Sequence, residues 1–233
     1  MRVAALLTFV TSVCLWIPAK AQSPGAAPAT LDPSRLRLHD VSASAVTHEG
    51  RPALRLVESD GRKDGGMAIV DQLSFHDVEI AVDVVGRRGP LAIPDDRGFV
   101  GVAFRVSPDA ARYEHIYLRP DNGRADDQVR RNHSTQYASH PDFPWPLLRK
   151  SFPEKYESYV DLQSGAWTSM RIVVRAATAR LYVHGSDQPT LMVNDLKLPP
   201  ARGGIALWIG PGTEAFFANL RTRSNDPAPP ARR

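Results

Sequence analysis

The chain has 233 residues, with 29 Lys and Arg against 25 Asp and Glu, so its formal net charge is +4 at pH 7. The excess of base is small and forms no long run, which argues against nucleic acid or an anionic membrane as a partner. The one cysteine, Cys14, lies near the N-terminus in a segment that we expect to be removed. The mature chain is therefore expected to have no disulfide, no cysteine-ligated zinc and no thiol nucleophile.

Residues 1–21 predict a secretory signal peptide. The positive Arg2 precedes a mostly apolar run over residues 3–17, and Ala19 and Ala21 offer small residues for cleavage. The run is too short to span a membrane, and no second one follows. We therefore expect an exported protein, secreted or periplasmic, without a membrane span.

The rest of the chain divides by composition into three parts. Residues 22–33 are rich in Ala and Pro and predict a flexible leader. Residues 34–223 predict one domain, long enough to build a hydrophobic core without disulfides. Residues 224–233 form a Pro- and Arg-rich tail that we expect to be disordered.

The domain is predicted to consist of strand after strand, with no convincing helical period. The alternation is clearest over residues 75–85, where Asp77, Glu79 and Asp83 face away from a row of Val and Ile. Gly185 suits the positive φ of a hairpin. Many short strands with Gly and Pro turns indicate an all-β jelly-roll sandwich of two antiparallel sheets. The predicted strands are residues 42–48, 53–57, 66–70, 75–85, 98–106, 113–119, 167–175, 180–183, 191–193, 203–210 and 215–220, the last two as a closing pair.

Five segments in this order resemble the concanavalin A-like lectin/glucanase superfamily, and within it laminin-G-like domains and the 3-keto-disaccharide hydrolase-like domains. The segments are GFVGVAFRV from Gly98, WTSMRIVV from Trp167, ARLYVHG from Ala179, GIALWIG from Gly204 and ANLR from Ala218. The resemblance covers residues 34–223. It implies one curved sheet that takes ligands on its concave face or at its rim.

In such a sandwich the faces turned away from the core are where function would lie. Opposite the apolar Ile116 and Leu118, the strand at 113–119 presents an aromatic and basic set, and Trp208 faces the same way on its own strand. Rings stack on the apolar faces of sugars, and Arg or His bonds the hydroxyls around them. The alternative is that Trp208 simply packs under a loop. The predicted platform is His115, Tyr117, Arg119, Arg105 and Trp208.

The stretch 119–160 predicts one long polar loop insertion. It has roughly forty residues, whereas a connection between strands usually has about two to six. Long ordered loops on a rigid scaffold often bind or react with ligands; the alternative is a solvated loop held by its own ion pairs. Arg130 and Arg131 have a guanidinium fork that matches the carboxylate of an acidic sugar. The further candidate ligand-binding residues are Asn122, Arg124, Asn132, Tyr137 and Trp145, and the candidate catalytic residues are His133, His140 and Arg131.

Metal binding is weakly indicated. His133, His140 and Asp142 match no strong ligand spacing, so no metal-ligating residue is assigned. Residues 121–127 carry oxygen ligands spaced somewhat like a calcium loop, without the closing Glu. The resemblance to lectin-like proteins leaves calcium open as a cofactor.

These patterns predict an exported domain that binds carbohydrate through the concave face and the 119–160 loop. The alternative is a glycan-active enzyme, a 3-keto-disaccharide hydrolase-like glycoside hydrolase or lyase, that uses His, Arg and Asp of the same loop. A third hypothesis, adhesion to a protein, would need an exposed apolar patch. The Glu-x-Asp-x-x-Glu motif of the glucanase branch is absent from the sequence. Asp77 and Glu79, roughly 6.6 Å apart on a strand, are the closest substitute.

Overall fold

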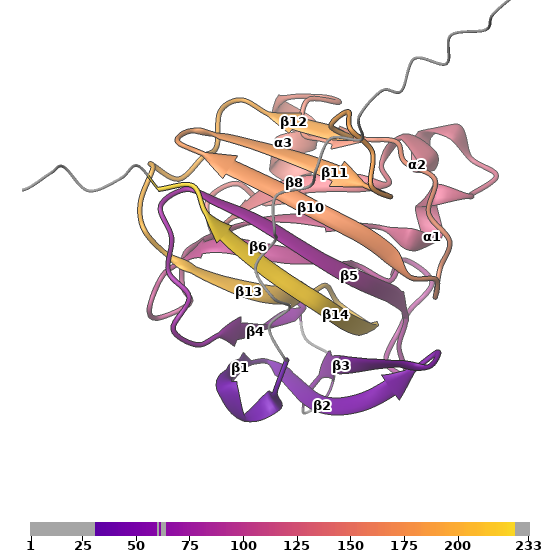
Figure 1. Ribbon diagram of the computed structural model, residues 1–233. Helices are drawn as coiled ribbons and strands as arrows, with labels where there is room; N and C mark the ends of the chain where they lie inside the picture. The colour runs from indigo at the N-terminus through magenta and orange to yellow at the C-terminus, as the bar shows by residue number, and fades with distance from the viewer. Residues whose placement is uncertain (1–30, 60, 62–63, 227–233) are drawn as a thin grey trace, which may run out of the picture.

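The computed structural model describes residues 31–59, 61 and 64–226, and the predicted signal peptide lies outside them. Figure 1 shows two antiparallel sheets stacked face to face, each with seven strands among the described residues. The order of the first sheet is β1-β4-β13-β6-β7-β8-β9, and that of the second is β12-β11-β10-β5-β14-β3-β2. This arrangement confirms the predicted all-β, two-sheet jelly-roll sandwich.

The strands of the first sheet are β1 Leu36–His39, β4 Gly66–Val70, β6 Val100–Val106, β7 Tyr113–Leu118, β8 Thr135–His140, β9 Glu157–Ser158 and β13 Gly204–Ile209. Those of the second sheet are β2 Val41–His48, β3 Arg51–Glu58, β5 Val78–Arg88, β10 Thr168–Arg175, β11 Thr178–Val183, β12 Leu191–Val193 and β14 Thr213–Ser224. The short helices are η1 Pro33–Arg35, α1 Pro120–Gly123, α2 Gln128–Asn132 and α3 Trp145–Ser151.

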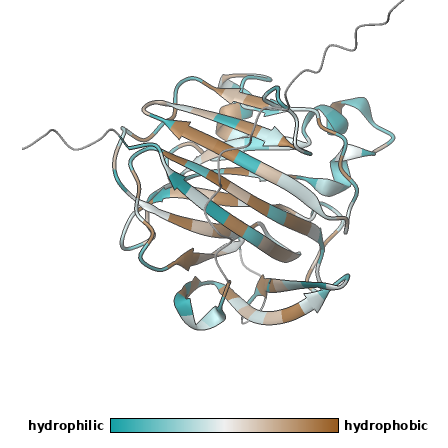
Figure 2. Ribbon diagram, viewed as in Figure 1, coloured by the Kyte–Doolittle hydropathy of each residue, from teal (hydrophilic) through white to brown (hydrophobic). Residues whose placement is uncertain are grey.

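The hydrophobic core lies between the two sheets. Phe104 of the first sheet and Phe217 of the second are both buried in it. On β5, Val78 and Ile80 point into the core while Glu79 between them is partly exposed, as the alternation predicted. Figure 2 shows the same alternation as brown and teal bands along the strands. Each such fully buried apolar side chain stabilises the fold by about 1.5–3 kcal/mol.

The stretch 119–160 is not a loop throughout. It contains β8, which pairs along the whole length of β7, and the helices α1, α2 and α3. The sequence of β8, Thr-Gln-Tyr-Ala-Ser-His, does not alternate between polar and apolar residues, so periodicity does not reveal it. Its buried Gln136 is satisfied by a distant partner, since the side-chain oxygen accepts a hydrogen bond of 2.9 Å from Arg119.

The predicted closing pair of strands is wrong. β13 pairs with β4 and β6 in the first sheet, whereas β14 pairs with β5 and β3 in the second. Leu207 and Phe217 therefore enter the core from opposite sides. Two apolar strands close in sequence can fill one core from either sheet, and alternation alone does not distinguish these arrangements.

The predicted position of Arg105 on the outer face is also wrong. Arg105 has φ 52°, and the pairing of β6 with β13 shifts register beside it, which marks a β-bulge. The bulge reverses the alternation. Arg105 turns to the core side, where it donates a hydrogen bond of 3.1 Å to Glu114, and Val106 joins the outer side.

Candidate functional site

The outer face of the first sheet, turned away from the second sheet, carries the aromatic residues that alternation predicted. On β7, Ile116 and Leu118 pack in the core, while Tyr117 belongs to a separate cluster on the outer side. On β13, Leu207 packs in the core and Trp208 joins that same outer cluster. The predicted faces of both strands are confirmed.

A glycine brings two of these rings together across β6. Gly101 pairs with Trp208 on one side and with Tyr117 on the other. A Cβ atom on Gly101 would lie 2.3 Å from the backbone oxygen of Ile116 and 2.6 Å from Cα of Tyr117. Because no side chain stands between them, the rings of Trp208 and Tyr117 approach to 4.8 Å, centroid to centroid.

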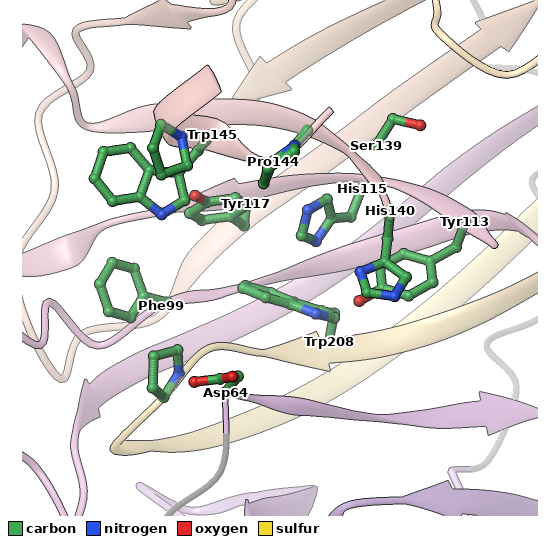
Figure 3. A pocket seen from close by; sticks show the side chains of 13 residues that line it. Asp64, Phe99, Tyr113, His115, Tyr117, Ser139, His140, Pro144, Trp145 and Trp208 are labelled. Atoms are coloured by element: carbon green, nitrogen blue, oxygen red, sulfur yellow. The ribbon is translucent and has the colours of Figure 1, made fainter. Parts of the chain in front are cut away.

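A pocket of about 350 Å³ opens over these rings, and we call it the aromatic pocket. In Figure 3, Trp145 and Phe99 lie toward one end of it and His140 and Tyr113 toward the other. Five aromatic side chains line it among the described residues, and its floor comes from β7 and β13. The lining residues are Asp64, Phe99, Tyr113, His115, Tyr117, Ala138, Ser139, His140, Pro144, Trp145, Pro146, Trp208 and Pro211.

His115 is the most buried histidine in the described lining of the aromatic pocket, with 8% of its surface exposed. Its ring meets Trp208 edge to face at 4.5 Å, and its Nδ1 has no hydrogen-bond partner among the described residues. Burial, aided by the nearby His140 and Arg119, lowers the pKa of His115 to about 3. The imidazole is therefore neutral at neutral pH, with one donor and one acceptor nitrogen for a bound molecule.

A buried charged cluster next to Tyr117 holds one wall of the aromatic pocket. Arg119 donates to Glu157 at 3.0 Å and to the Tyr117 hydroxyl at 3.1 Å, and Arg149 donates to the same carboxylate. Burial opposes ionisation of Glu157, but Arg149 and Arg119 outweigh it and lower its pKa. Both guanidinium groups also lie over the ring of Trp145, at 5.4 and 4.6 Å. Arg119 thus supports the lining without being part of it.

The two candidate catalytic histidines lie in different places. His140 lines the aromatic pocket and stacks on Tyr113 with 4.8 Å between ring centroids. His133 belongs to the charged cluster, where its Nδ1 lies 3.1 Å from Glu157 Oε2 without hydrogen-bond geometry. Burial lowers the pKa of both histidines, although Glu157 opposes this effect at His133.

Tyr137 and Asn122 are buried away from the aromatic pocket. Tyr137 pairs with Ile116 across β7 and β8 and, like it, faces the core, where its hydroxyl donates to Glu114 at 2.7 Å. Asn122 donates to the backbone oxygen of His133 at 3.1 Å. Both side chains hold the stretch 119–160 on the sheet.

The helices α1 and α2 and their ends carry four further predicted residues, none of them in the described lining of the pocket: Arg124, Arg130, Arg131 and Asn132. Arg124 forms an exposed ion pair with Asp161 at 2.8 Å. Arg131 donates to the hydroxyl of Tyr159 at 2.9 Å and lies over the same ring. An Arg130–Arg131 clamp on an acidic sugar would therefore be separate from the pocket.

Residues 121–127 do not fit a calcium loop, because their carboxylates have separate partners. Asp121 pairs with Arg88 at 2.8 Å. Asp127 caps α2 by accepting a hydrogen bond of 2.8 Å from the backbone N–H of Arg130. Within the described part of the chain, no group of three or more His, Cys, Asp or Glu could hold a metal ion.

Sequence reasoning missed several contributors to the aromatic pocket, among them Phe99 and Asp64. Phe99 has a local signal, since it precedes Gly101 by two residues and so shares its face. Asp64 lies in a turn-rich segment, and its approach to Trp208 depends on β4 lying beside β13. No local sequence pattern indicates that β4 and β13 are neighbours.

The two-sheet sandwich is the fold that the resemblance to the concanavalin A-like lectin/glucanase superfamily implied, and solved structures of lectin-like sandwiches share it. The carbohydrate-binding module CBM66 from Bacillus subtilis is similar, with a TM-score of 0.57, 13% identity, and coverage of 82% of this chain and 96% of that chain. A protein of unknown function with a galectin-like fold from Bacillus subtilis has a TM-score of 0.52, 10% identity, and coverage of 86% and 94%.

A putative glycosyl hydrolase from Parabacteroides distasonis is also similar, with a TM-score of 0.51, 12% identity, and coverage of 84% of this chain and 98% of that chain. At these identities the likeness establishes the fold alone. No protein-family model matches the sequence, and no curated protein matches it. Among the described residues, no helix has the length and apolar character needed to cross a membrane.

Proposed function

We propose that this chain is a carbohydrate-binding domain that takes a sugar ring into the aromatic pocket. The observation that carries the proposal is a pocket of about 350 Å³ lined by five aromatic side chains of the described residues, with the unpartnered Nδ1 of His115 beneath them. Sugars present apolar C–H faces that stack on rings, and hydroxyls that pair with isolated polar groups. Similar folds in a carbohydrate-binding module and a galectin-like protein are consistent with this function.

The second candidate is a glycan-active enzyme of the 3-keto-disaccharide hydrolase type, and the observation in its favour is His140 in the pocket lining. Hydrolysis by the usual route needs two carboxyl groups about 5 to 9.5 Å apart. Asp64 is the only carboxylate of the described residues in the lining. His133 and Arg131 lie outside the described lining, so binding without turnover is the better supported function.

The signal peptide and the export that it implies are part of the same proposal. A domain without disulfides is compatible with a secreted or periplasmic setting, because two packed sheets supply a core that needs no covalent cross-link. The N-terminal sequence of the mature protein, isolated from culture medium or periplasm, tests this directly. A chain that starts after Ala21 is expected, and an intact N-terminus in the cytoplasm would contradict export.

Binding is tested on a glycan array, followed by calorimetry with the best ligand. Trp208→Ala removes a ring from the floor of the pocket and Trp145→Ala one from its rim, where 42% of the side chain is exposed and truncation spares the core. A central aromatic contact is worth about 2 kcal/mol or more, so each variant is expected to lose roughly thirtyfold in affinity. Product release from the same ligand reports any turnover.

The matched control is Tyr182→Ala. Tyr182 lies on β11 in the other sheet, where the guanidinium of Arg171 lies 3.8 Å from its ring centre. This variant should keep wild-type affinity. An array with no bound glycan, or equal losses for Trp145→Ala and Tyr182→Ala, would overturn the proposed site, and turnover that depends on His140 would establish the enzyme instead.

A further inference from the structure

We propose that an acidic groove continues the aromatic pocket and makes the protein selective for glycans that carry free amino groups. The inference rests on the proposed function, because it names the class of sugar that the same site would take. The groove is a second hollow of about 1010 Å³ that shares Asp64, Tyr113, His140 and Pro144 with the aromatic pocket. The two hollows are therefore one continuous surface along the first sheet.

Three carboxylates set the charge of the acidic groove: Asp40, Asp64 and Asp109. Neither hollow has a Lys or Arg in the part of its lining that the structure describes. Asp109 accepts hydrogen bonds from the Ser107 hydroxyl at 2.5 Å and from the backbone N–H of Ala111 at 3.1 Å, and these bonds lower its pKa. It therefore stays ionised at neutral pH.

Besides His140, the described lining of the acidic groove holds one basic group, His39, whose Nδ1 lies 3.2 Å from Asp40 Oδ2. The arginines near the groove have partners outside its lining. Arg37 donates to the backbone oxygen of Pro108 at 2.7 Å. Arg112 lies 3.5 Å from Asp142, with both side chains exposed. Burial lowers the pKa of His140, so that this imidazole adds no positive charge at neutral pH. The lining thus presents negative charge that a cationic ligand would complement.

The aromatic pocket supplies a second, independent indication of a ligand. His115 is 8% exposed, lines the pocket and has no hydrogen-bond partner for Nδ1 in the described part of the chain. A sugar ring in the pocket lies over Trp208 and next to His115. Figure 3 places His140 and Tyr113 at one end of the pocket, and because both residues also line the acidic groove, a chain that extends past them enters it.

An ammonium group on the next sugar would form charge-assisted hydrogen bonds to these carboxylates. A uronic acid at the same position would meet like charges and bind more weakly. An acetylated amine carries no charge and gains neither effect. The chemistry of the groove therefore separates three glycans of equal length by charge alone.

The experiment measures affinity by calorimetry at pH 6 for tetramers of β-1,4-linked glucosamine, N-acetylglucosamine and glucuronic acid. The glucosamine tetramer is expected to bind at least about tenfold more tightly than the acetylated one, and the glucuronic acid tetramer the least. Because the gain is electrostatic, it should shrink when the salt concentration is raised.

Asp64→Asn and Asp109→Asn test the groove itself, and Asp187→Asn is the matched control. Asp64 is exposed and Asp187 is an exposed residue of the β11–β12 hairpin, so neither change alters the core. The first two variants should lower the preference for glucosamine over N-acetylglucosamine severalfold, because each removes a negative charge that only the free amine complements. The control should keep the wild-type preference.

Equal or tighter binding of the acetylated or acidic tetramer would overturn the inference, as would an unchanged preference in Asp64→Asn and Asp109→Asn. If none of the three tetramers binds while another glycan binds on the array, the inference fails and the proposed function stands. If no glycan binds at all, the proposed function fails with it.

Discussion

The two sheets place their charged side chains in opposite positions. The first sheet buries them: Arg105 and Glu114 pair with 3% and 0% of their side chains exposed. The second sheet keeps them on its outer face, where Glu79 pairs with Arg223 at 2.6 Å and Glu214 accepts from Arg55 at 2.6 Å. Both sheets have seven strands in the described structure, so the number of strands does not explain the difference.

The comparison indicates which face is available to a ligand. On the second sheet the charges of Glu79 and Glu214 are matched by neighbouring guanidinium groups, so these two carboxylates need no further partner. On the first sheet the rings of Tyr117 and Trp208 and the side chain of His115 line a hollow, and the buried Nδ1 of His115 has no hydrogen-bond partner in the described part of the chain. Burial of the charges leaves an aromatic surface that a ligand can cover.

The largest expected effect comes from one substitution made on each sheet. Glu114→Gln leaves the buried Arg105 without its counter-charge and should destabilise the protein by about 3–5 kcal/mol. Glu79→Gln breaks an ion pair in which 60% of the Arg223 side chain is exposed, and should cost less than about 1 kcal/mol. Urea unfolding of both variants gives the two values.

Equal losses for the two variants would show that the sheets do not differ in how they hold charge. Tyr137→Phe sharpens the result, since it leaves both charges in place. It removes the hydrogen bond of 2.7 Å that the tyrosine hydroxyl donates to Glu114 and the one of 2.8 Å that it accepts from the backbone N–H of Lys197. Its cost should be about 1–3 kcal/mol, between the other two values.

The next effect is a dependence of stability on pH that originates in the aromatic pocket. The pKa of His115 is about 3 in the folded chain and 6.5 without the fold. Between these values the unfolded chain binds a proton that the folded chain does not, so acidification favours unfolding. One such proton is worth up to about 1.4 kcal/mol per pH unit.

His115→Asn removes this contribution. From pH 7.5, where the imidazole is neutral in both states, down to pH 5, the wild type should lose up to roughly 2 kcal/mol more than the variant. Thermal or urea unfolding at several pH values measures the difference. Parallel curves for the two proteins would show that His115 accepts a proton in the folded state as readily as in the unfolded one.

Local alternation predicts which side chains of the first sheet point outward at many positions, and long-range contacts determine the direction of the others. The outward direction of Tyr117 and Trp208 follows from a period of two residues, which needs no knowledge of the neighbours. Arg105 breaks that period through a bulge with φ 52°, and its reversal depends on the buried Glu114 that receives it. The polar sequence of β8 does not predict a strand. Its buried Gln136 is explained only by the hydrogen bond from Arg119, which lies on the connection before it.

The residues of the candidate site are harder to predict than the strands, because polar composition does not distinguish a residue that supports a pocket from one that lines it. Arg119 and His133 look like ligand-binding or catalytic residues in a polar loop. In the structure both side chains lie against Glu157. Arg119 and Arg149, which also donates to Glu157, lie over the ring of Trp145. The aromatic residues of the pocket come together only because β6, β7 and β13 lie side by side in the sheet, and this neighbourhood is not visible in the sequence.

The last expected effect tests whether a missing side chain on β6 creates the aromatic surface. Gly101→Ala would place a Cβ 2.3 Å from the backbone oxygen of Ile116, so the strands must move apart and the ring contact between Tyr117 and Trp208 must loosen. Overpacking of this kind costs about 1–3 kcal/mol. Gly204→Ala is the matched control in the same sheet, because its Cβ would meet Val106 at an ordinary 3.5 Å.

The control should leave the free energy of unfolding within about 1 kcal/mol of the wild type. Gly101→Ala should lower both that free energy and the affinity for the glycan, since one movement of β6 against β7 affects both. A loss of stability with unchanged affinity would mean that the rings keep their places without the glycine. In that case the packing of Trp208 against His115, at 4.5 Å between ring centroids, would be what positions the pocket floor.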